Sequence, residues 1–188
     1  MTVLADPSTS PLFEALRRRR MHRAFTDEPV ADELLEQLAW AASRAPMGGN
    51  QLMRRIVVVT DPRRVRTLRL VTPSFGAIGS VAVMVLCTDL AVALERMGTL
   101  GRDLLSLVDA GAAAENVAIA APALGLGVSF IRSANDAALR SVLALPTHIR
   151  PDMMIAIGHP VAQPAAAARS RRPEIDRDQF GEPWRSEQ

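Results

Sequence analysis

Apolar residues dominate the stretch from residue 103 to residue 131, DLLSLVDAGAAAENVAIAAPALGLGVSFI. It begins with leucines at helical spacing and continues with alanine and glycine, and Asp109, Glu115 and Asn116 interrupt its apolar surface. A helix that is apolar nearly all round belongs in a core, or at a dimer axis where small residues let two backbones approach closely. We predict one long helix with a bend before Pro122, an end at Gly125 to Gly127, and a strand over 128–131.

The remaining apolar positions predict a series of shorter elements. Helices are expected at 11–18, within 31–46, at 62–70 and at 135–143; strands are expected at 55–60, 81–88 and 153–158, and turns at 47–53 and 72–80. The strand at 55–60 is β-branched at every position after Arg55 and is expected to be buried. These elements do not alternate as in a doubly wound sheet, so we predict an α+β layer fold with helices around a small sheet.

The two ends of the chain differ from its middle. We predict one domain over 1–188, in which 1–10 and 161–188 are extended arms. The C-terminal arm is rich in Pro, Ala and Arg and has no core of its own, yet it contains Phe180 and Trp184. Two large aromatic side chains near a terminus usually dock on another surface.

Composition indicates an ordinary globular protein, with 48% hydrophobic and 22% charged residues among 188. The first residues carry no signal-peptide pattern, and no apolar run reaches the roughly 18 to 20 residues free of polar groups that a membrane span needs. The single cysteine, Cys87, excludes an intramolecular disulfide and lies in an apolar run. We therefore expect a cytoplasmic protein without a membrane partner.

Charge and histidine positions narrow the chemistry further. The net charge is +2, and all 22 basic residues are arginines. The run Arg17 to Arg20 is, by itself, most simply a solvated helix end, and no interleaved aromatic residues accompany it to indicate nucleic-acid binding. The three histidines lack metal-ligand spacing, so no metal site is expected.

Four segments, in order along the chain, resemble the nitroreductase family of flavin enzymes. They are RRMHRAF at 19–25, APMGGN at 45–50, GAAAENVAIAAPALGLG at 111–127 and IGHP at 157–160. The resemblance implies a three-layer α+β fold, in which helices surround a small mixed or antiparallel sheet. It also implies a homodimer with the long helix at its axis, a domain-swapped C-terminal tail, and FMN bound in the interface by both chains.

The same resemblance implies what the protein does. FMN would pass a hydride through its N5 atom, with NAD(P)H as donor and a nitroaromatic, a quinone or a similar small molecule as acceptor. No side chain would be catalytic in itself, because the flavin carries the chemistry and the protein binds and tunes it. The implied cofactor-binding residues are Arg19, Arg20, Met21, Arg23, Pro46, Met47, Gly48, Asn50, Ile131, Arg132, Arg171 and Arg172.

Individual roles follow from the family's pattern. Arg19 would hold the phosphate, and Arg23 would lie near the pyrimidine edge of the ring. Asn50, with the backbone of Met47 and Gly48, would contact the ring from the other subunit. The segment 130–133 would pass beside N5, and Arg171 or Arg172 would close on the phosphate.

This sequence departs from the family's pattern at two hydroxyl positions, which are Met21 and Met47 here, and in the residues after Asn50, which read Gln-Leu-Met-Arg. A thioether donates no hydrogen bond. Each lost bond to a charged phosphate corresponds to roughly 1.5 to 3 kcal/mol. Two alternatives remain open. The departures motivate the first, a degenerate protein that binds or sequesters flavin without turnover.

The other alternative is an oxidase that acts on a peptide-like metabolite with a small partner subunit. The short chain and the run VRTLRLVTPSFGAIGSVAVMVLCTD are similar to the catalytic subunit of cyclodipeptide oxidases. Such a subunit would pass electrons to oxygen and ignore NAD(P)H.

Overall fold

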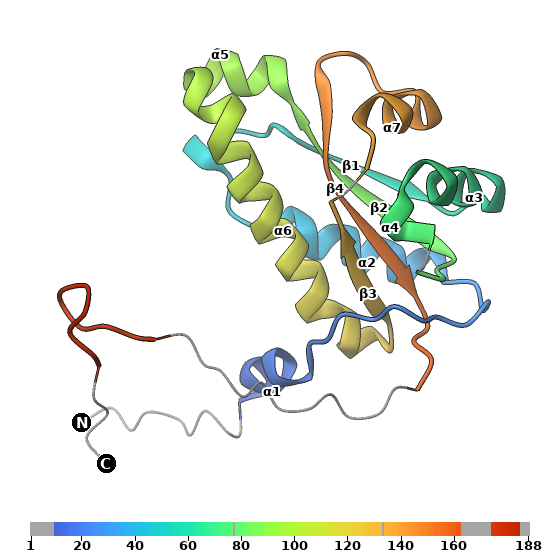
Figure 1. Cartoon of the computed structure of the whole chain (residues 1–188), viewed down its shortest axis with the longest axis horizontal. Coiled ribbons are helices and arrows are strands. Elements are labelled where there is room, and N and C mark those ends of the chain that lie inside the picture. Colours follow the sequence, from blue (N-terminus) through green and yellow to red (C-terminus); the bar gives the residue numbers. More distant parts are fainter. Residues whose placement is uncertain (1–9, 77, 133, 163–173, 185–188) are drawn as a thin grey trace.

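A four-stranded sheet forms the centre of the protein (Figure 1). The computed structural model describes residues 10–76, 78–132, 134–162 and 174–184. The strands are β1 (Arg54–Val59), β2 (Ala82–Asp89), β3 (Gly127–Ile131) and β4 (Ile149–Gly158). Their order is β1-β2-β4-β3, and each neighbouring pair is antiparallel.

Helices cover both faces of this sheet. They are α1 (Pro11–Arg18), α2 (Asp32–Ser43), α3 (Pro62–Val71), α4 (Pro73–Gly76), α5 (Leu90–Leu100), α6 (Ser106–Ala120) and α7 (Asp136–Leu143). The first apolar core lies between one face of the sheet and α2 and α6, and the second lies between the other face and α3 and α7. The predicted three-layer α+β fold is confirmed.

The central position of strand β2 explains why its sequence is apolar without alternation. All eight of its residues are buried, because β1 and β4 flank it and helices cover both of its faces. Met84 and Leu86 point into the core under α2 and α6, whereas Val83 and Val85 point into the core under α3 and α7. Cys87 also lies on this strand and is buried, and burial raises the pKa of its thiol to about 12.

Helix α6 packs a face of small side chains against the sheet. Ala113, Ala114, Val117 and Ala118 are fully buried in the first core. The predicted glycine end is confirmed, since Gly125 adopts φ 70°, a left-handed conformation that suits glycine. The helix also changes to a tighter 3-10 turn at Ala121–Leu124, where Pro122 cannot donate a backbone hydrogen bond.

The start of this helical region differs from the prediction. A π-helical turn at Gly101–Leu105 precedes α6, and α5 precedes that turn, although the sequence pattern did not indicate a helix there. Gly98 interrupts α5 with φ 64°. Leu104 and Val108 are 54% and 60% exposed, so the expectation of burial all round the helix is wrong for a single chain.

Two strand predictions and one turn prediction also need correction. Strand β1 is only half-buried, because it lies at the edge of the described sheet with β2 as its single neighbour. Strand β4 begins at Ile149 instead of Met153, since its pairing with β2 continues past a register shift. The expected turn region at 72–80 contains the short helix α4.

The helical run Leu90–Leu124 is also long and apolar enough to cross a membrane by length and composition. The core helix of a globular domain satisfies the same criterion. Within this run, α6 buries its alanine face against α2 and the sheet, as a core helix does.

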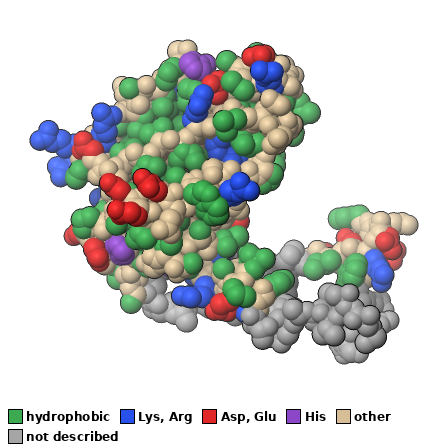
Figure 2. Space-filling model, turned by 180° about the vertical axis from the view of Figure 1, so that it is seen from behind, with side chains coloured by type: hydrophobic (Ala, Val, Ile, Leu, Met, Phe, Trp, Pro, Cys, Tyr) green, Lys and Arg blue, Asp and Glu red, His purple; other side chains and the backbone are tan. Residues whose placement is uncertain are grey.

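The C-terminal segment 174–184 stands away from the sheet and helices (Figures 1 and 2). Asp176 and Pro183 pair across a turn, and Arg177 lies over the Trp184 ring at 4.8 Å. Phe180 is 101% exposed and Trp184 is 54% exposed. Among the described residues, the two aromatic side chains therefore have no docking surface beyond their own segment.

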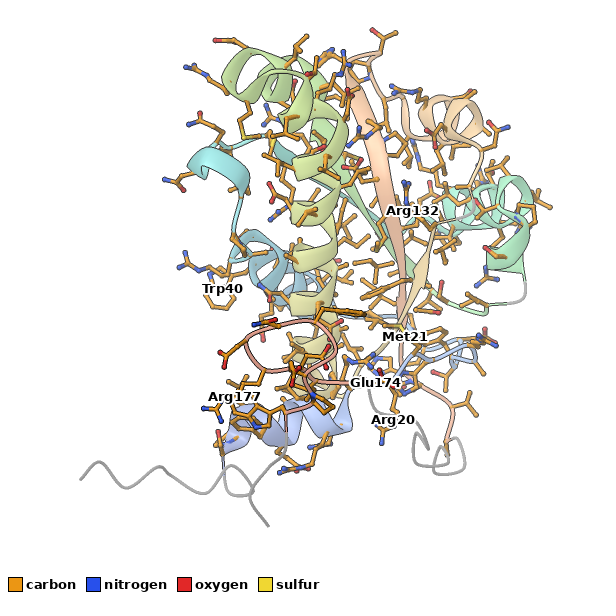
Figure 3. All side chains as sticks on the ribbon, turned by 60° about the vertical axis from the view of Figure 1, so that its left-hand side comes forward. Arg20, Met21, Trp40, Arg132, Glu174 and Arg177 are labelled. Atoms are coloured by element: carbon orange, nitrogen blue, oxygen red, sulfur yellow. The ribbon has the colours of Figure 1, made fainter. Side chains whose placement is uncertain are left out.

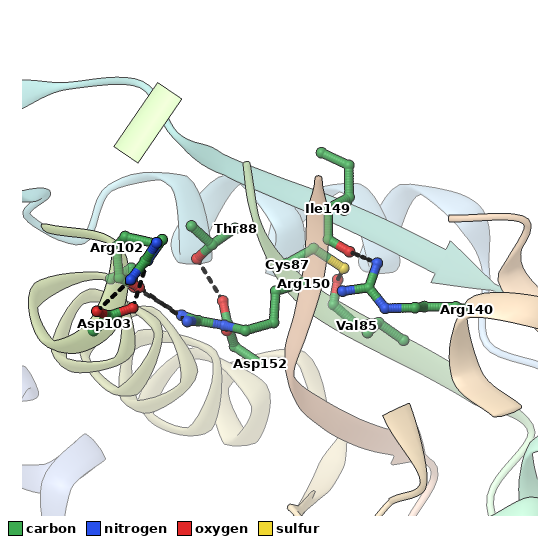
Figure 4. Close-up of polar contacts among 10 residues, drawn as sticks. Val85, Cys87, Thr88, Arg102, Asp103, Arg140, Ile149, Arg150 and Asp152 are labelled. Atoms are coloured by element: carbon green, nitrogen blue, oxygen red, sulfur yellow. Dashed lines mark hydrogen bonds and ion pairs between the residues drawn. The ribbon is translucent and has the colours of Figure 1, made fainter. Parts of the chain in front are cut away.

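A buried polar network ties β4 to the turn before α6 (Figure 4). Asp152 is 2% exposed, accepts a hydrogen bond from Thr88 at 2.5 Å, and pairs with Arg150 at 2.6 Å. Arg150 also donates to the Ser106 hydroxyl and to the Arg102 carbonyl. Burial raises the pKa of Asp152, and the hydrogen bonds from Thr88 and Arg150 act in the opposite direction.

We predict that Arg150→Met lowers the free energy of unfolding by about 3 kcal/mol, because it leaves a buried carboxylate without its partner. Adding Asp152→Asn should recover much of this loss, since the unpaired charge is then removed. Urea unfolding measures both effects. The control is Arg96→Met, which breaks an exposed pair with Glu95 and should change stability by less than about 1 kcal/mol. Equal effects of Arg150→Met and Arg96→Met would show that the network is energetically unimportant.

Candidate functional site

The first cluster of predicted site residues lies on the segment that follows α1. Met21 pairs in parallel with Val128 of β3, and the His22 backbone N–H donates to the Val128 carbonyl at 2.8 Å. Phe25, the last residue of the RRMHRAF segment, is 9% exposed and pairs with Pro160 just after β4. These contacts fix the segment beside the edge of the sheet.

The three arginines of this segment have different environments. Arg19 forms an ion pair with Glu115 of α6 at 3.3 Å, and its side chain is 21% exposed. Arg20 donates to the carbonyls of Arg17 and Arg19 and so closes the end of α1. The exposed Arg23 makes no hydrogen bond or ion pair with any described residue. Figure 3 shows Met21 beside the sheet and Arg20 further from it.

Strand β3 connects this segment to the next predicted residues. Ile131 is buried at the end of β3, and Arg132 follows it as an exposed side chain (Figure 3). Val128 and Arg132 are four residues apart, or about 13 Å along a strand. Met21 and Arg132 therefore mark two ends of one elongated surface.

His22 fills the space beneath this surface. It contacts Phe25, with ring centroids 6.4 Å apart, and a Cβ atom at Gly127 would lie 2.8 Å from its Cγ. Burial, followed by the charge of Arg20, lowers the pKa of His22. Gly127 is thus required by close packing against a neutral imidazole.

The second cluster is the loop at residues 46–50, and side chains of α6 and β1 hold it in place. The Gly48 backbone N–H donates to Asp109 Oδ2 at 2.7 Å. Gly49 and Asn50 have φ angles of 57° and 53°, and the Asn50 side chain is exposed. A left-handed backbone is uncommon for residues other than glycine, and asparagine tolerates it best.

Arg54 is the main support of this loop. Its guanidinium donates to the carbonyls of Ala42, Pro46 and Asp109 at 3.0, 3.3 and 2.8 Å. Burial lowers the pKa of Arg54, and the nearby carboxylates of Asp109 and Asp152 oppose that shift. Arg54, one of the residues at which this sequence departs from the family's pattern, thus joins α2, the loop and α6.

The two clusters do not meet within one chain. They are anchored on α6 by Glu115 and Asp109, which are six residues apart. Six residues correspond to a rise of about 9 Å and to directions about 120° apart around the helix. The structure therefore brings Arg19, Met21, Arg23 and Arg132 to one side, and the 46–50 loop to another. Arg171, Arg172 and Ser133 lie outside the described residues.

Sequence reasoning did not assign a role to Asp109, Glu115 or Arg54. The sequence did contain a signal: Asp109 and Glu115 are carboxylates in an otherwise apolar helix, and such carboxylates need partners. The chain offers arginines for this purpose in the segments at 19–23 and 54–55. A buried face tolerates such carboxylates when they have partners. Which arginine or backbone group each carboxylate contacts depends on tertiary packing.

We predict that Arg54→Met loosens the 46–50 loop, because three backbone carbonyls lose their donor. Hydrogen exchange of the loop amides, above all that of Gly48, should become at least about tenfold faster, which corresponds to about 1.4 kcal/mol. Arg55→Met is the matched control, because that neighbouring side chain is 59% exposed and reaches Asp89 only at 3.8 Å. Unchanged exchange in Arg54→Met would contradict this supporting role.

Comparison with known proteins places this geometry in a family. The model of the nitroreductase family matches residues 16–75 and 64–159. The FMN reductase [NAD(P)H] of Bacillus subtilis is 30% identical over 84% of this chain and 69% of its own length. The oxygen-insensitive NADPH nitroreductase of Salmonella typhimurium is 31% identical over 82% of this chain and 68% of its own length.

A solved structure extends this similarity to three dimensions. A protein from Desulfovibrio desulfuricans, described as a nitroreductase in complex with FMN, superposes with a TM-score of 0.74 and 31% identity. The superposition covers 87% of this chain and 92% of that one. The family match spans most of the chain, includes both clusters, and agrees with the observed fold: this protein belongs to the nitroreductase family.

Proposed function

We propose that this protein is an FMN-dependent oxidoreductase that takes a hydride from NAD(P)H and passes it to a small acceptor such as a nitroaromatic or a quinone. Membership of the nitroreductase family, and the chain's similarity to the FMN reductase of Bacillus subtilis and the nitroreductase of Salmonella typhimurium, support this function. The structural observation that carries it is the elongated, arginine-bearing surface along β3.

The residues of this surface fit FMN. Arg19 and Arg23 offer guanidinium donors at one end of β3, and Arg132 offers another at the far end. Arg23 and Arg132 make no hydrogen bond or ion pair with other described residues, so they can bind a ligand without first breaking one. Met21 is 37% exposed beside them and offers an apolar contact without a donor.

Each residue would contribute binding or charge. When bound, FMN supplies the hydride-carrying N5 atom. Arg19, oriented by Glu115, would hold the phosphate, and Arg23 would place positive charge at the N1 and O2 edge. The backbone near Ile131 and Arg132 would face N5. Asn50 and the loop at 46–50 would complete the ring site from a second chain.

A homodimer is part of this proposal. The outward side of the helical run 90–120 carries apolar residues at intervals of four, namely Leu100, Leu104 and Val108, which are 57%, 54% and 60% exposed. Trp40 of α2 is 67% exposed and points outward near α6 (Figure 3). A two-fold axis across α6 would bury these side chains and bring the 46–50 loop of one chain to β3 of the other. The exposed Phe180 and Trp184 would dock on the partner.

The proposed function is tested by the colour and reduction of the purified protein. Bound FMN should give flavin absorption bands, and anaerobic mixing with NADH or NADPH should bleach them. A protein that remains colourless when FMN is added would overturn the proposal. A flavin that neither nicotinamide reduces would favour binding without turnover, or an oxidase that works with a partner subunit.

We predict that Arg23→Ala and Arg19→Ala have separable effects on bound FMN. Arg23 would stabilise charge that develops on reduction, so its removal should lower the reduction potential. A charged hydrogen bond of roughly 1.5 to 3 kcal/mol corresponds to about 30 to 60 mV for two electrons. Arg19→Ala should weaken FMN binding at least about tenfold and leave the potential nearly unchanged, because the phosphate has the same charge in both redox states. Spectroelectrochemistry and fluorescence titration measure the two quantities. Identical behaviour of both variants and the parent would disprove the assigned roles.

We predict that Val108→Asp produces a monomer that retains less FMN, because it places a charge in the proposed dimer contact and separates the two half-sites. Analytical ultracentrifugation and the flavin-to-protein absorbance ratio test this outcome. The matched control is Leu70→Asp on α3, where the parent side chain is 80% exposed and far from α6. A Val108→Asp variant that remains dimeric with full flavin content would refute the proposed axis.

A further inference from the structure

A cavity lies on the α3 side of the molecule, and none of its lining residues was assigned above to the flavin. It has a volume of about 330 Å³ and lies between the extended segment before α2, the end of β1, α3 and the start of β2. Its lining residues are Asp27, Pro29, Val30, Thr60, Pro62, Val65, Arg66, Arg69, Ser80, Val81 and Ala82. This volume is at the lower end of the range for small-molecule sites.

The polar groups of this cavity favour an anion. Arg66 and Arg69 are three residues apart on α3 and therefore lie on the same side of the helix. Arg69 donates a hydrogen bond to the Ser80 carbonyl, which fixes its guanidinium at the cavity wall. Among the described lining residues Asp27 is the only carboxylate, so their positive charge exceeds their negative charge by one.

Ser80 supplies an independent indication of a ligand. The residue is 3% exposed, and its Oγ has no hydrogen-bond partner among the described residues. A buried hydroxyl without a partner is unfavourable by about 1 to 3 kcal/mol. Because Ser80 lines the cavity, a ligand with an acceptor atom would remove this deficit.

The apolar walls define the rest of the ligand. Val30 and Val65 are 8% and 4% exposed. The other apolar residues of the wall are Pro29, Pro62, Val81 and Ala82. Inorganic phosphate is polar on every side and would leave this wall unused. We propose that the cavity binds a small organic monoanion, a carboxylate on a compact apolar body, with Arg66, Arg69 and the Ser80 hydroxyl on the carboxylate.

The binding test uses the full-length, FMN-loaded protein and 4-fluorobenzoate as the probe, followed by fluorine NMR. We expect a Kd on the order of 1 mM, as suits a ligand of about ten heavy atoms. The neutral isostere 4-fluorobenzamide should bind at least about tenfold more weakly than 4-fluorobenzoate. Inorganic phosphate, added as a competitor for the site, should also bind at least about tenfold more weakly than the probe. Failure to bind 4-fluorobenzoate, or equal binding of the amide, would overturn the proposal.

Substitutions locate the bound probe. Arg66→Gln and Ser80→Ala should each weaken binding about tenfold, whereas Arg63→Gln makes the same charge change on the same helix outside the lining and should have no effect. Ser80→Ala should also leave the melting temperature of the unliganded protein equal or higher, because it deletes an unpartnered hydroxyl. Probe binding that both lining variants retain in full would place the ligand elsewhere and overturn the assignment. Neither result depends on NAD(P)H turnover, so failure here is distinct from failure of the proposed function.

Discussion

The close packing of α6 against the sheet is the constraint on which both halves of the site depend. Ala113, Ala114 and Val117 leave no exposed surface between the helix and the strands. Small side chains at these positions set the distance between helix and sheet, and a larger one would force the helix outward or into strain. Since Asp109 and Glu115 project from the same helix, any such displacement would move the 46–50 loop and Arg19 together.

Two carboxylates of this packed helix hold the segments that we propose for FMN binding. The carboxylate of Glu115 orients Arg19, and the carboxylate of Asp109 holds the Gly48 amide. Both acidic residues are only partly buried, so each retains some hydration while it positions its partner. The groups that we propose for FMN binding, the Arg19 guanidinium and the loop at Gly48, are in this way oriented in advance, which would lower the ordering cost of binding.

The segment after α1 links the surface along β3 to the α3-side cavity. Its first part runs beside β3 and carries Arg23, and its continuation lines the α3-side cavity at Asp27 and Val30. Phe25 lies between them against Gly158, where a Cβ atom would come within 3.0 Å of the ring. This anchor separates a surface suited to a flavin from a cavity suited to a small anion.

Much of the fold could be predicted from local patterns. The buried run of β2, the end of the long helix at Gly125 and the Asn135 cap of α7 follow from side-chain size, glycine geometry and capping chemistry, each of which acts within a few residues. The family motifs identified the arginine segment and the 46–50 loop by the same kind of local signal.

What only the tertiary structure decided was the set of contacts between distant residues. The β-branched residues of β1 predicted a buried strand, but the strand order places β1 at an edge of the described sheet. Burial depends on neighbouring elements that a local pattern does not specify. The same reason applies to Arg54, whose carbonyl partners lie up to 55 residues away. It applies also to Ser80, because the packing of α3 decides whether its buried hydroxyl finds a partner among the described residues. The sequence by itself determined which chemical groups the chain carries and, through glycine geometry, capping and side-chain size, the type of most of its elements. Long-range packing decided where β4 begins, which strand lies at the edge of the described sheet, and which chemical groups meet.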